Sequence, residues 1–267
     1  MTLKNYLLIF GLTSALVFTS CSKEEETTDD NSAPPKIEVK GSASSGNIID
    51  LPQNASTANN GQFQGVTSNI NTVGQFITLL NSVPENATTD RSTNSGVTYN
   101  WSVSNNGITI EYWYTVEENG ANYNITYDLA YTSVANPELS FARTTLLTGW
   151  IAQNGQAGDL TINYNVLSNT GDFNLNYHYT WNTEANGDLN VVADFNLGAD
   201  SQTANVHYVA KVYAAGGGYV DYTYTNTNQE SIAWHYEWNA DWTVVSWTYT
   251  INGSEDTNYS GTWTATA

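Results

Sequence analysis

Residues 107–131 read GITIEYWYTVEENGANYNITYDLAY, and this stretch sets the pattern for the rest of the chain. Apolar and polar residues alternate on both sides of the segment at positions 118–121. The first run has apolar side chains at every second position, namely Ile108, Ile110, Tyr112, Tyr114 and Val116. A period of two is typical of a β-strand with one buried face. The stretch therefore predicts an antiparallel hairpin.

The expected turn of this hairpin is the Asn-Gly pair at positions 119–120, a favoured two-residue loop. A turn centred on this pair places Tyr112 opposite Tyr127 and Ile110 opposite Leu129. Apolar residues then face apolar residues, so the predicted register is self-consistent.

The same alternation continues to the C-terminus, with turn residues such as Asn-Gly and Gly-Gly-Gly between the runs. No helical pattern interrupts it, which predicts an all-β fold, a single antiparallel up-and-down meander of about 12 strands. Sheets of this size curl, so we expect a closed barrel or a strongly curved half-barrel. The expected strands are residues 96–104, 108–117, 122–132, 139–152, 159–167, 173–182, 188–197, 203–213, 219–226, 231–239, 242–251 and 258–266.

One segment before the sheet has a helical period. Ser68 can cap its start, and Pro84 prevents its continuation. We expect this single N-terminal helix to pack its apolar stripe against the sheet. The stripe consists of Ile70, Val73, Phe76, Ile77 and Leu80.

A helix followed by a long meander resembles, in element order alone, the half-barrel lipid-carrier folds of bacterial envelopes. A transmembrane β-barrel has the same alternation and is the alternative. Two observations argue against that alternative: the turns are short on both sides, and the sequence ends in Thr-Ala-Thr-Ala with no final aromatic residue.

The chain is strongly acidic. Its 267 residues include 26 acidic and 7 basic side chains, which give a formal net charge of −19. Such a charge repels polyanions, so we expect no nucleic-acid partner. With 18 Tyr and 9 Trp in a polar chain, burial must depend on large rings whose polar ends stay near water.

The N-terminus has the pattern of an export signal. Lys4 precedes an apolar run at residues 6–18, which is too short to span a bilayer but suits a signal peptide over residues 1–20. Cys21, the only cysteine, follows two small residues. This arrangement resembles a bacterial lipobox, with Phe18 where that family usually has Leu, and implies that Cys21 is lipidated. The alternative is ordinary secretory cleavage that leaves a free thiol.

Residues 22–26 read SKEEE and resemble the sorting signal of Bacteroidota surface-exported lipoproteins. This resemblance covers only the first 26 residues. It implies a palmitate-type anchor in the outer membrane, with the protein facing the cell exterior. The polar composition of residues 21–65 predicts a mostly disordered tether, which leaves residues 66–267 as the helix-plus-meander domain. Apolar segments at 37–39 and 48–51 are candidates for edge strands.

Two carboxylates face each other in the predicted register, Glu111 and Asp128. Close carboxylates can act as a catalytic acid and nucleophile, or can hold Ca²⁺. A two-residue register shift would separate them, and exposed like charges can also simply be tolerated. Glu111 and Asp128 are the candidate catalytic residues that the sequence offers.

The three histidines, His178, His207 and His235, lie 29 and 28 residues apart, one hairpin repeat each. We expect them on alternate strands and on the polar face. Strands two apart are separated by about 9.5 Å, too far for one metal ion. We expect no metal site and interpret the histidines either as a row of surface residues or as a trace of duplicated hairpins. They are also candidate binding residues.

Trp113 and Trp242 are the remaining binding candidates, because the alternation of their strands places them at positions that do not face the core. Exposed indole rings can stack on sugars or on apolar ligands. Trp234, Trp238 and Trp247 have the parity of core residues.

No sequence motif predicts a cofactor, a nucleotide site or a nucleophile elbow. The leading hypothesis is a non-enzymatic surface lipoprotein that binds a glycan or an apolar small molecule. The alternatives are a carboxylate-dependent polysaccharide hydrolase or lyase, and a structural or adhesin-like coat protein without a pocket.

Overall fold

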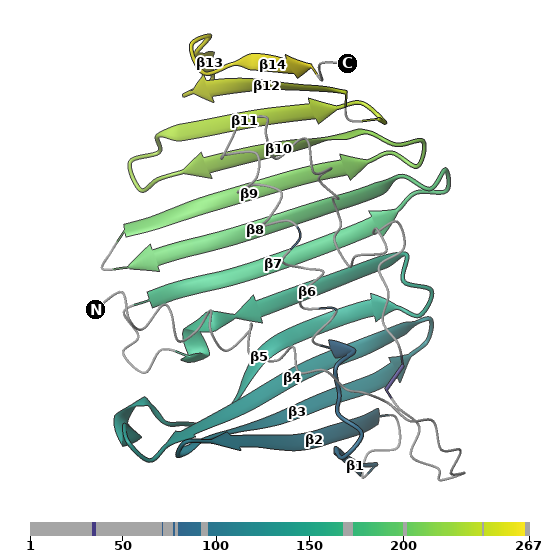
Figure 1. Cartoon of the computed structure of the whole chain (residues 1–267), viewed down its shortest axis with the longest axis vertical. Helices are drawn as coiled ribbons and strands as arrows, with labels where there is room; N and C mark the ends of the chain where they lie inside the picture. Colours follow the sequence, from purple (N-terminus) through teal and green to yellow (C-terminus); the bar gives the residue numbers. More distant parts are fainter. Residues whose placement is uncertain are drawn as a thin grey trace. The chain divides into compact units, whose positions relative to one another are not determined.

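The computed structural model describes residues 34–35, 71, 77, 80–91, 96–167, 173–199, 202–241 and 243–264. These residues form one antiparallel sheet of 14 strands (Figure 1). Each strand from β1 to β12 pairs with the next one along the chain, and β14 also pairs with β12. The predicted all-β meander is confirmed.

The strand bounds lie close to the expected ones through most of the sheet. The 3₁₀ turn η3 (Tyr164–Leu167) occupies the end of a predicted strand, and the 3₁₀ turn η2 (Pro137–Leu139) overlaps the start of another only at Leu139. The short strands β1 and β13 were not predicted. In chain order the strands are β1 (Thr88–Asp90), β2 (Gly96–Asn105), β3 (Ile108–Asn119), β4 (Asn122–Ser133), β5 (Phe141–Ala152), β6 (Ala157–Asn163), β7 (Phe173–Thr183), β8 (Leu189–Ala199), β9 (Gln202–Val212), β10 (Gly218–Thr225), β11 (Ser231–Trp238), β12 (Val244–Ile251), β13 (Ser254–Glu255) and β14 (Gly261–Thr264).

The sheet is open, so of the two expected forms, a closed barrel and a strongly curved half-barrel, the closed barrel is wrong. Closure requires the first and last strands to pair along their length. Among the described strands, β1 has three residues, β13 has two and β14 has four, and β1 pairs only with β2.

Most of the predicted helix lies outside the described residues. Among those described, Asn71, Ile77 and Leu80 are helical, and the N–H of Asn81 donates to the carbonyl of Ile77 at 3.1 Å. Ile77 and Leu80 are buried in the same hydrophobic cluster as the sheet residues. The other three residues of the predicted stripe lie outside the described residues, so the packing of a whole helix against the sheet stays a prediction.

Three further expectations fall on segments that the structure does not describe: the signal peptide with Cys21, almost all of the tether, and the candidate edge strands at 37–39 and 48–51. In the described part of the chain, no helix is long and apolar enough to cross a membrane.

The register of the first hairpin differs from the predicted one by two residues. Asn119 pairs with Asn122, so the loop consists of positions 120–121, and Tyr112 lies opposite Leu129. Gly120 has a φ of +62°, and Ala121 does not have a positive φ. A positive φ at the first loop position alone is the requirement of a type II′ turn, which glycine satisfies best.

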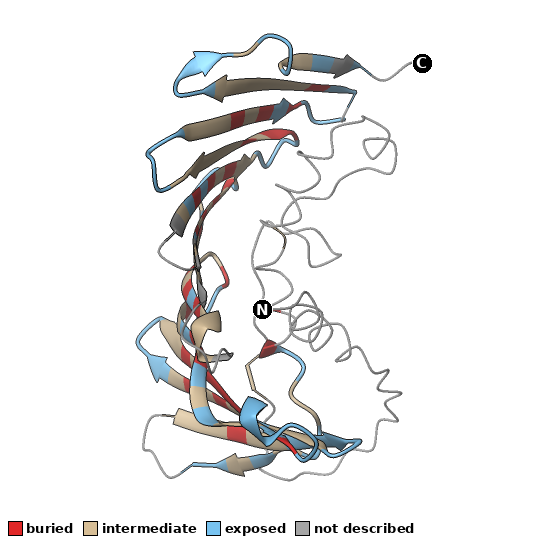
Figure 2. Cartoon of the chain, turned by 90° about the vertical axis from the view of Figure 1, so that its left-hand side faces the viewer, coloured by how far each residue is buried: buried red, intermediate tan, exposed pale blue. Residues whose placement is uncertain are grey.

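The core lies on one face of the sheet. Buried residues alternate with more exposed ones along β3 and β11, as the banding in Figure 2 shows. Rings fill much of this face. On β7–β9, Phe195 contacts Tyr177, Tyr179 and Tyr208 in edge-to-face geometry, with centroids 4.3–5.6 Å apart. Such pairs add stability beyond the area that they bury.

Candidate functional site

Three histidine–aspartate pairs lie on the opposite face, which we call the polar face. His178 on β7 binds Asp159 on β6, with Nε2 2.9 Å from Oδ1. The other two pairs repeat this arrangement on the next two hairpins. His207 Nδ1 lies 2.7 Å from Asp194 Oδ1, and His235 Nδ1 lies 2.6 Å from Asp221 Oδ1.

The strand register brings these partners together. Asp194 lies directly opposite His207, and Asp221 lies directly opposite His235. His178 is opposite Thr161 and reaches Asp159 diagonally. In each case the aspartate belongs to the even-numbered strand that precedes the histidine strand.

The residue after each histidine fixes the orientation of the imidazole. Tyr179, Tyr208 and Tyr236 are all buried in the core. Because neighbouring side chains of a strand point to opposite faces, burial of these tyrosines turns the histidines outward. The prediction that the histidines occupy alternate strands and the polar face is confirmed.

The pairs remain accessible to a ligand. The three imidazoles are 44–49% exposed and the three carboxylates 38–47%. Each pair uses one ring nitrogen and one carboxylate oxygen, so the second nitrogen and the second oxygen can bond a ligand. No three His, Cys, Asp or Glu side chains within the described residues converge as a metal site.

Short polar side chains surround the pairs. Residues paired across successive strands form rows on this face. One row consists of four asparagines on β6–β9, at positions 163, 176, 196 and 205. The next row runs from Thr161 through His178, Asp194 and His207 to Thr223. Side chains within such a row recur at the interstrand spacing of about 4.8 Å. The polar face therefore presents hydrogen-bonding groups at regular intervals across the strands.

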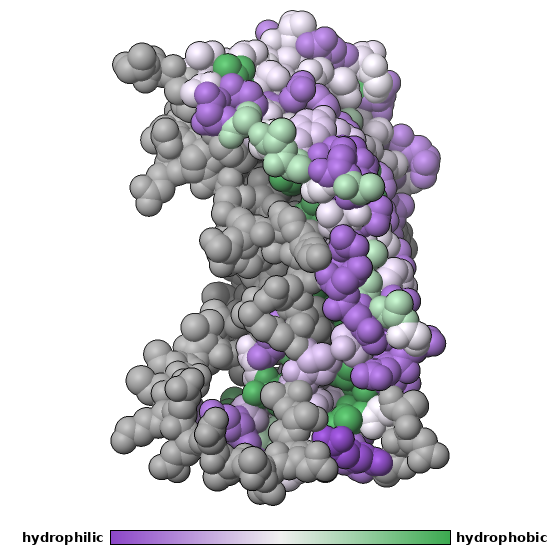
Figure 3. Space-filling model, turned by 90° about the vertical axis from the view of Figure 1, so that its right-hand side faces the viewer, coloured by the Kyte–Doolittle hydropathy of each residue, from purple (hydrophilic) through white to green (hydrophobic). Residues whose placement is uncertain are grey.

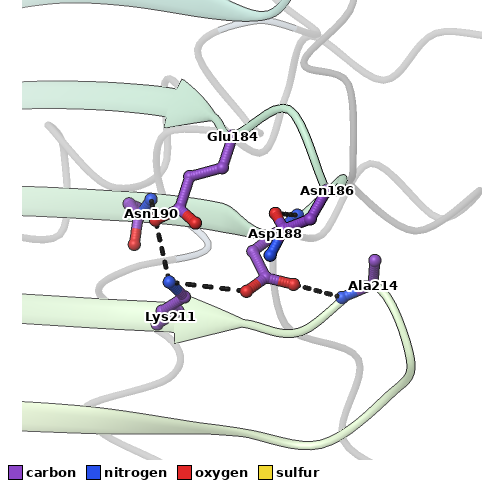
Figure 4. Close-up of polar contacts among 6 residues, drawn as sticks. All are labelled: Glu184, Asn186, Asp188, Asn190, Lys211 and Ala214. Atoms are coloured by element: carbon purple, nitrogen blue, oxygen red, sulfur yellow. Dashed lines mark hydrogen bonds and ion pairs between the residues drawn. The ribbon is translucent and has the colours of Figure 1, made fainter.

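A charged network joins the ends of β7, β8 and β9 (Figure 4). Lys211 Nζ lies 2.8 Å from Glu184 Oε1 and 3.4 Å from Asp188 Oδ2. Asn190 donates to Glu184 at 2.8 Å, and the backbone N–H of Ala214 donates to Asp188 at 3.0 Å. The network ties the β7–β8 turn to the β9–β10 turn. Figure 3 views the sheet from the side where these turns lie, and hydrophilic residues dominate the described surface there.

These contacts shift the ionisation of all three charged groups. Hydrogen bonds from Lys211 and Asn190 lower the pKa of Glu184, and the N–H of Ala214 lowers the pKa of Asp188. The hydrogen bond to Glu184 raises the pKa of Lys211. Each group is thus held in its charged form.

The proposed carboxylate pair does not form. Glu111 lies opposite Ala130, and Asp128 lies opposite Trp113. The cause is the two-residue shift that follows from a loop at positions 120–121. The facing carboxylates that suggested a hydrolase are therefore absent from the described hairpin.

Asp128 instead belongs to a cluster with Arg143 and Trp113. Arg143 donates from Nε at 2.8 Å, its Nη2 lies 2.7 Å from the same carboxylate oxygen, and Thr145 donates to the other oxygen at 2.8 Å. The guanidinium lies 4.7 Å from the centre of the Trp113 ring. The indole candidate is thus paired with a cation. Trp242 lies outside the described residues.

Three of the predicted site residues, the histidines, share one face, but their aspartate partners were not predicted. The sequence did contain a signal for them, because the alternation of apolar and polar residues in each strand places the aspartate on the polar face. Finding the pairs also required the register of each hairpin. Among protein-family models, curated proteins and solved structures, none matches this chain.

Proposed function

We propose that this protein is a surface-anchored outer-membrane lipoprotein that binds a glycan through the polar face of its sheet. The observation that supports glycan binding is the repeated histidine–aspartate pair, which leaves hydrogen-bonding atoms accessible on three successive hairpins. Sugar hydroxyls both donate and accept hydrogen bonds, so they match a surface that offers both kinds of group.

The spacing of the polar side chains within a row favours an extended glycan. Side chains in one row recur at the interstrand distance of about 4.8 Å. This distance is close to the length of one pyranose ring in an extended chain. A polymer that runs across the strands would follow such a row and meet a polar side chain at each strand, and weak contacts would add up by multivalency.

Charge and burial argue against the other ligand classes. Arg143 and Lys211 are the only Lys or Arg residues from position 96 onward, and both are paired with carboxylates. An anionic polymer would be repelled. The aromatic rings of the opposite face are engaged in the core, which disfavours an apolar ligand there.

Glycan binding is tested with the full chain on an array of neutral, amino and acidic glycans. We expect neutral glycans to bind wild-type protein, and the combined His178→Ala, His207→Ala and His235→Ala variant to lose the signal. Thr132→Ala, an exposed change on β4 of the same sheet, is the control. An array without signal for wild-type protein would contradict the proposal, as would equal binding by the triple variant.

The anchor is a separate part of the proposal. It rests on Cys21, the apolar run at residues 6–18 and the SKEEE segment that follows the cysteine. Labelling of cells with a clickable palmitate analogue should mark wild-type protein and leave Cys21→Ser unmarked. External protease should digest the wild-type protein on intact cells. Resistance to protease would place the protein on the inner side of the outer membrane instead.

A further inference from the structure

A ladder of three rings lies at one end of the polar face. Tyr213, at the start of the β9–β10 turn, lies 6.5 Å from Tyr219 on β10 between ring centroids. Tyr219 in turn stacks on His235 of β11, at 5.9 Å and 29°. His235 is the histidine that binds Asp221. Aromatic surface and a polar pair thus meet at one place.

Tyr213 is the exposed end of this ladder, with 36% of its surface accessible. Its backbone is held firmly in the turn. The N–H of Tyr213 donates to the carbonyl of Gly217 at 3.1 Å, and its carbonyl accepts from Gly216 at 2.8 Å. The bond from Ala214 to Asp188 fixes the turn from its other side.

The two glycines let this turn pack closely against the end of β11. Gly216 and Gly217 have φ angles of +91° and +79°, which favour glycine. A Cβ at Gly217 would lie 2.7 Å from the carbonyl oxygen of Trp238, and one at Gly216 would lie 2.9 Å from Cβ of Ala240. The ring of Tyr213 is therefore carried by a preorganised loop, which lowers the entropy cost of binding.

Opposite charges flank the central ring. Tyr219 lies opposite Lys211 on one side and Glu237 on the other. Glu237 is exposed and has no hydrogen-bond partner within the described strands. The ammonium of Lys211 has three donors, of which Glu184 and Asp188 use two. A donor and an acceptor are thus available beside the rings.

We propose that Tyr213, Tyr219 and His235 form the subsite on which one uncharged pyranose ring of the glycan stacks. This inference rests on the proposed function. The apolar face of the sugar lies on the exposed phenol ring, and its hydroxyls bond Lys211, Glu237 and the Asp221–His235 pair. Four carboxylates lie around the rings, which excludes a sugar with a carboxylate of its own.

The test is affinity electrophoresis of the full chain in gels that contain mannan, xyloglucan, mixed-linkage glucan or polygalacturonate. We expect retardation by at least one of the three neutral polymers and none by polygalacturonate. Tyr213→Ala should weaken the binding about tenfold, since a stacked ring and its buried area are lost. Tyr213→Phe should recover most of this loss, because the ring remains.

Tyr259→Ala is the matched control, since this tyrosine is also exposed, at 60%, but lies between β13 and β14. Its binding should equal that of wild-type protein. If a neutral polymer retards the wild type and Tyr213→Ala equally, the ring subsite is refuted while glycan binding stands. If no polymer retards the wild type, both are refuted. Binding of polygalacturonate would refute the uncharged class. Circular dichroism of each variant confirms that the fold is intact.

Discussion

Asp128 and Arg143 lie on neighbouring strands, and Asp128 accepts Nε–H of Arg143 at 2.8 Å, with Nη2 2.7 Å from the same oxygen. A bulge in the pairing of β4 with β5 makes this contact possible. Tyr127 pairs with Leu147, but Asp128 pairs with Thr145, so Leu146 is the extra residue. Bulges of this kind change the direction of the side chains beside them.

The first prediction concerns this ion pair. The Asp128 carboxylate is only 10% exposed, whereas Arg143 is 50% exposed and can regain water when its partner is removed. Asp128→Ala should therefore lower the free energy of unfolding by about 1–2 kcal/mol, less than for a fully buried pair. Glu111→Gln, an exposed change on β3, should stay within about 0.5 kcal/mol of wild type. Urea denaturation measures both, and equal effects would contradict the assignment.

The second prediction concerns two buried hydroxyls. The hydroxyls of Tyr114 and Tyr127 are buried and have no hydrogen-bond partner in the described structure. A buried polar group without a partner costs about 1–3 kcal/mol. Tyr114→Phe and Tyr127→Phe should each raise the free energy of unfolding by about 1 kcal/mol. Tyr114→Leu should lower it by about 2 kcal/mol or more, because the ring contacts are lost. A loss of stability in the Phe variants would reveal a partner for the hydroxyl.

The third prediction is a loss of stability at alkaline pH. Burial raises the pKa of Tyr112 to about 12 and also raises the pKa of Tyr127. Between pH 10 and 12 the unfolded chain loses these protons and the folded chain keeps them, so stability falls as pH rises. The slope is about 1.4 kcal/mol per pH unit for each such tyrosine. Urea midpoints from pH 8 upward should be flat until pH 10 and then decline, with a shallower decline in Tyr112→Phe.

The fourth prediction concerns the Lys211 network at acid pH. The pKa values of Glu184 and Asp188 are lowered from 4.5 and 3.8, so their contribution is present above those values and is lost as pH falls through the folded-state pKa. Lys211→Met removes the part of this contribution that comes from the lysine, whereas Asn190 and the N–H of Ala214 still bind the two carboxylates. Between pH 5 and pH 2, the urea midpoint of wild-type protein should fall more than that of the variant. Parallel curves would show that the network does not stabilise the fold.

Local chemistry was sufficient to predict most strands and turns. The Asn-Gly pairs at 106–107 and 252–253 form two-residue loops in which both residues have a positive φ, as type I′ turns require. The same rule failed at position 120, where glycine occupies the first loop position instead of the second. Two loop types thus fit one short sequence, and the choice between them moved the register by two residues.

The sequence by itself determined which residues face the core, because alternation is a property of a single strand and a two-residue shift leaves it unchanged. It thereby placed the histidines on the polar face. Only the tertiary structure decided that the sheet stays open, that Asp128 binds Arg143 rather than facing Glu111, and that each histidine meets an aspartate. These features depend on contacts between strands. The register of neighbouring strands and the pairing of the edge strands are set only when the whole sheet assembles.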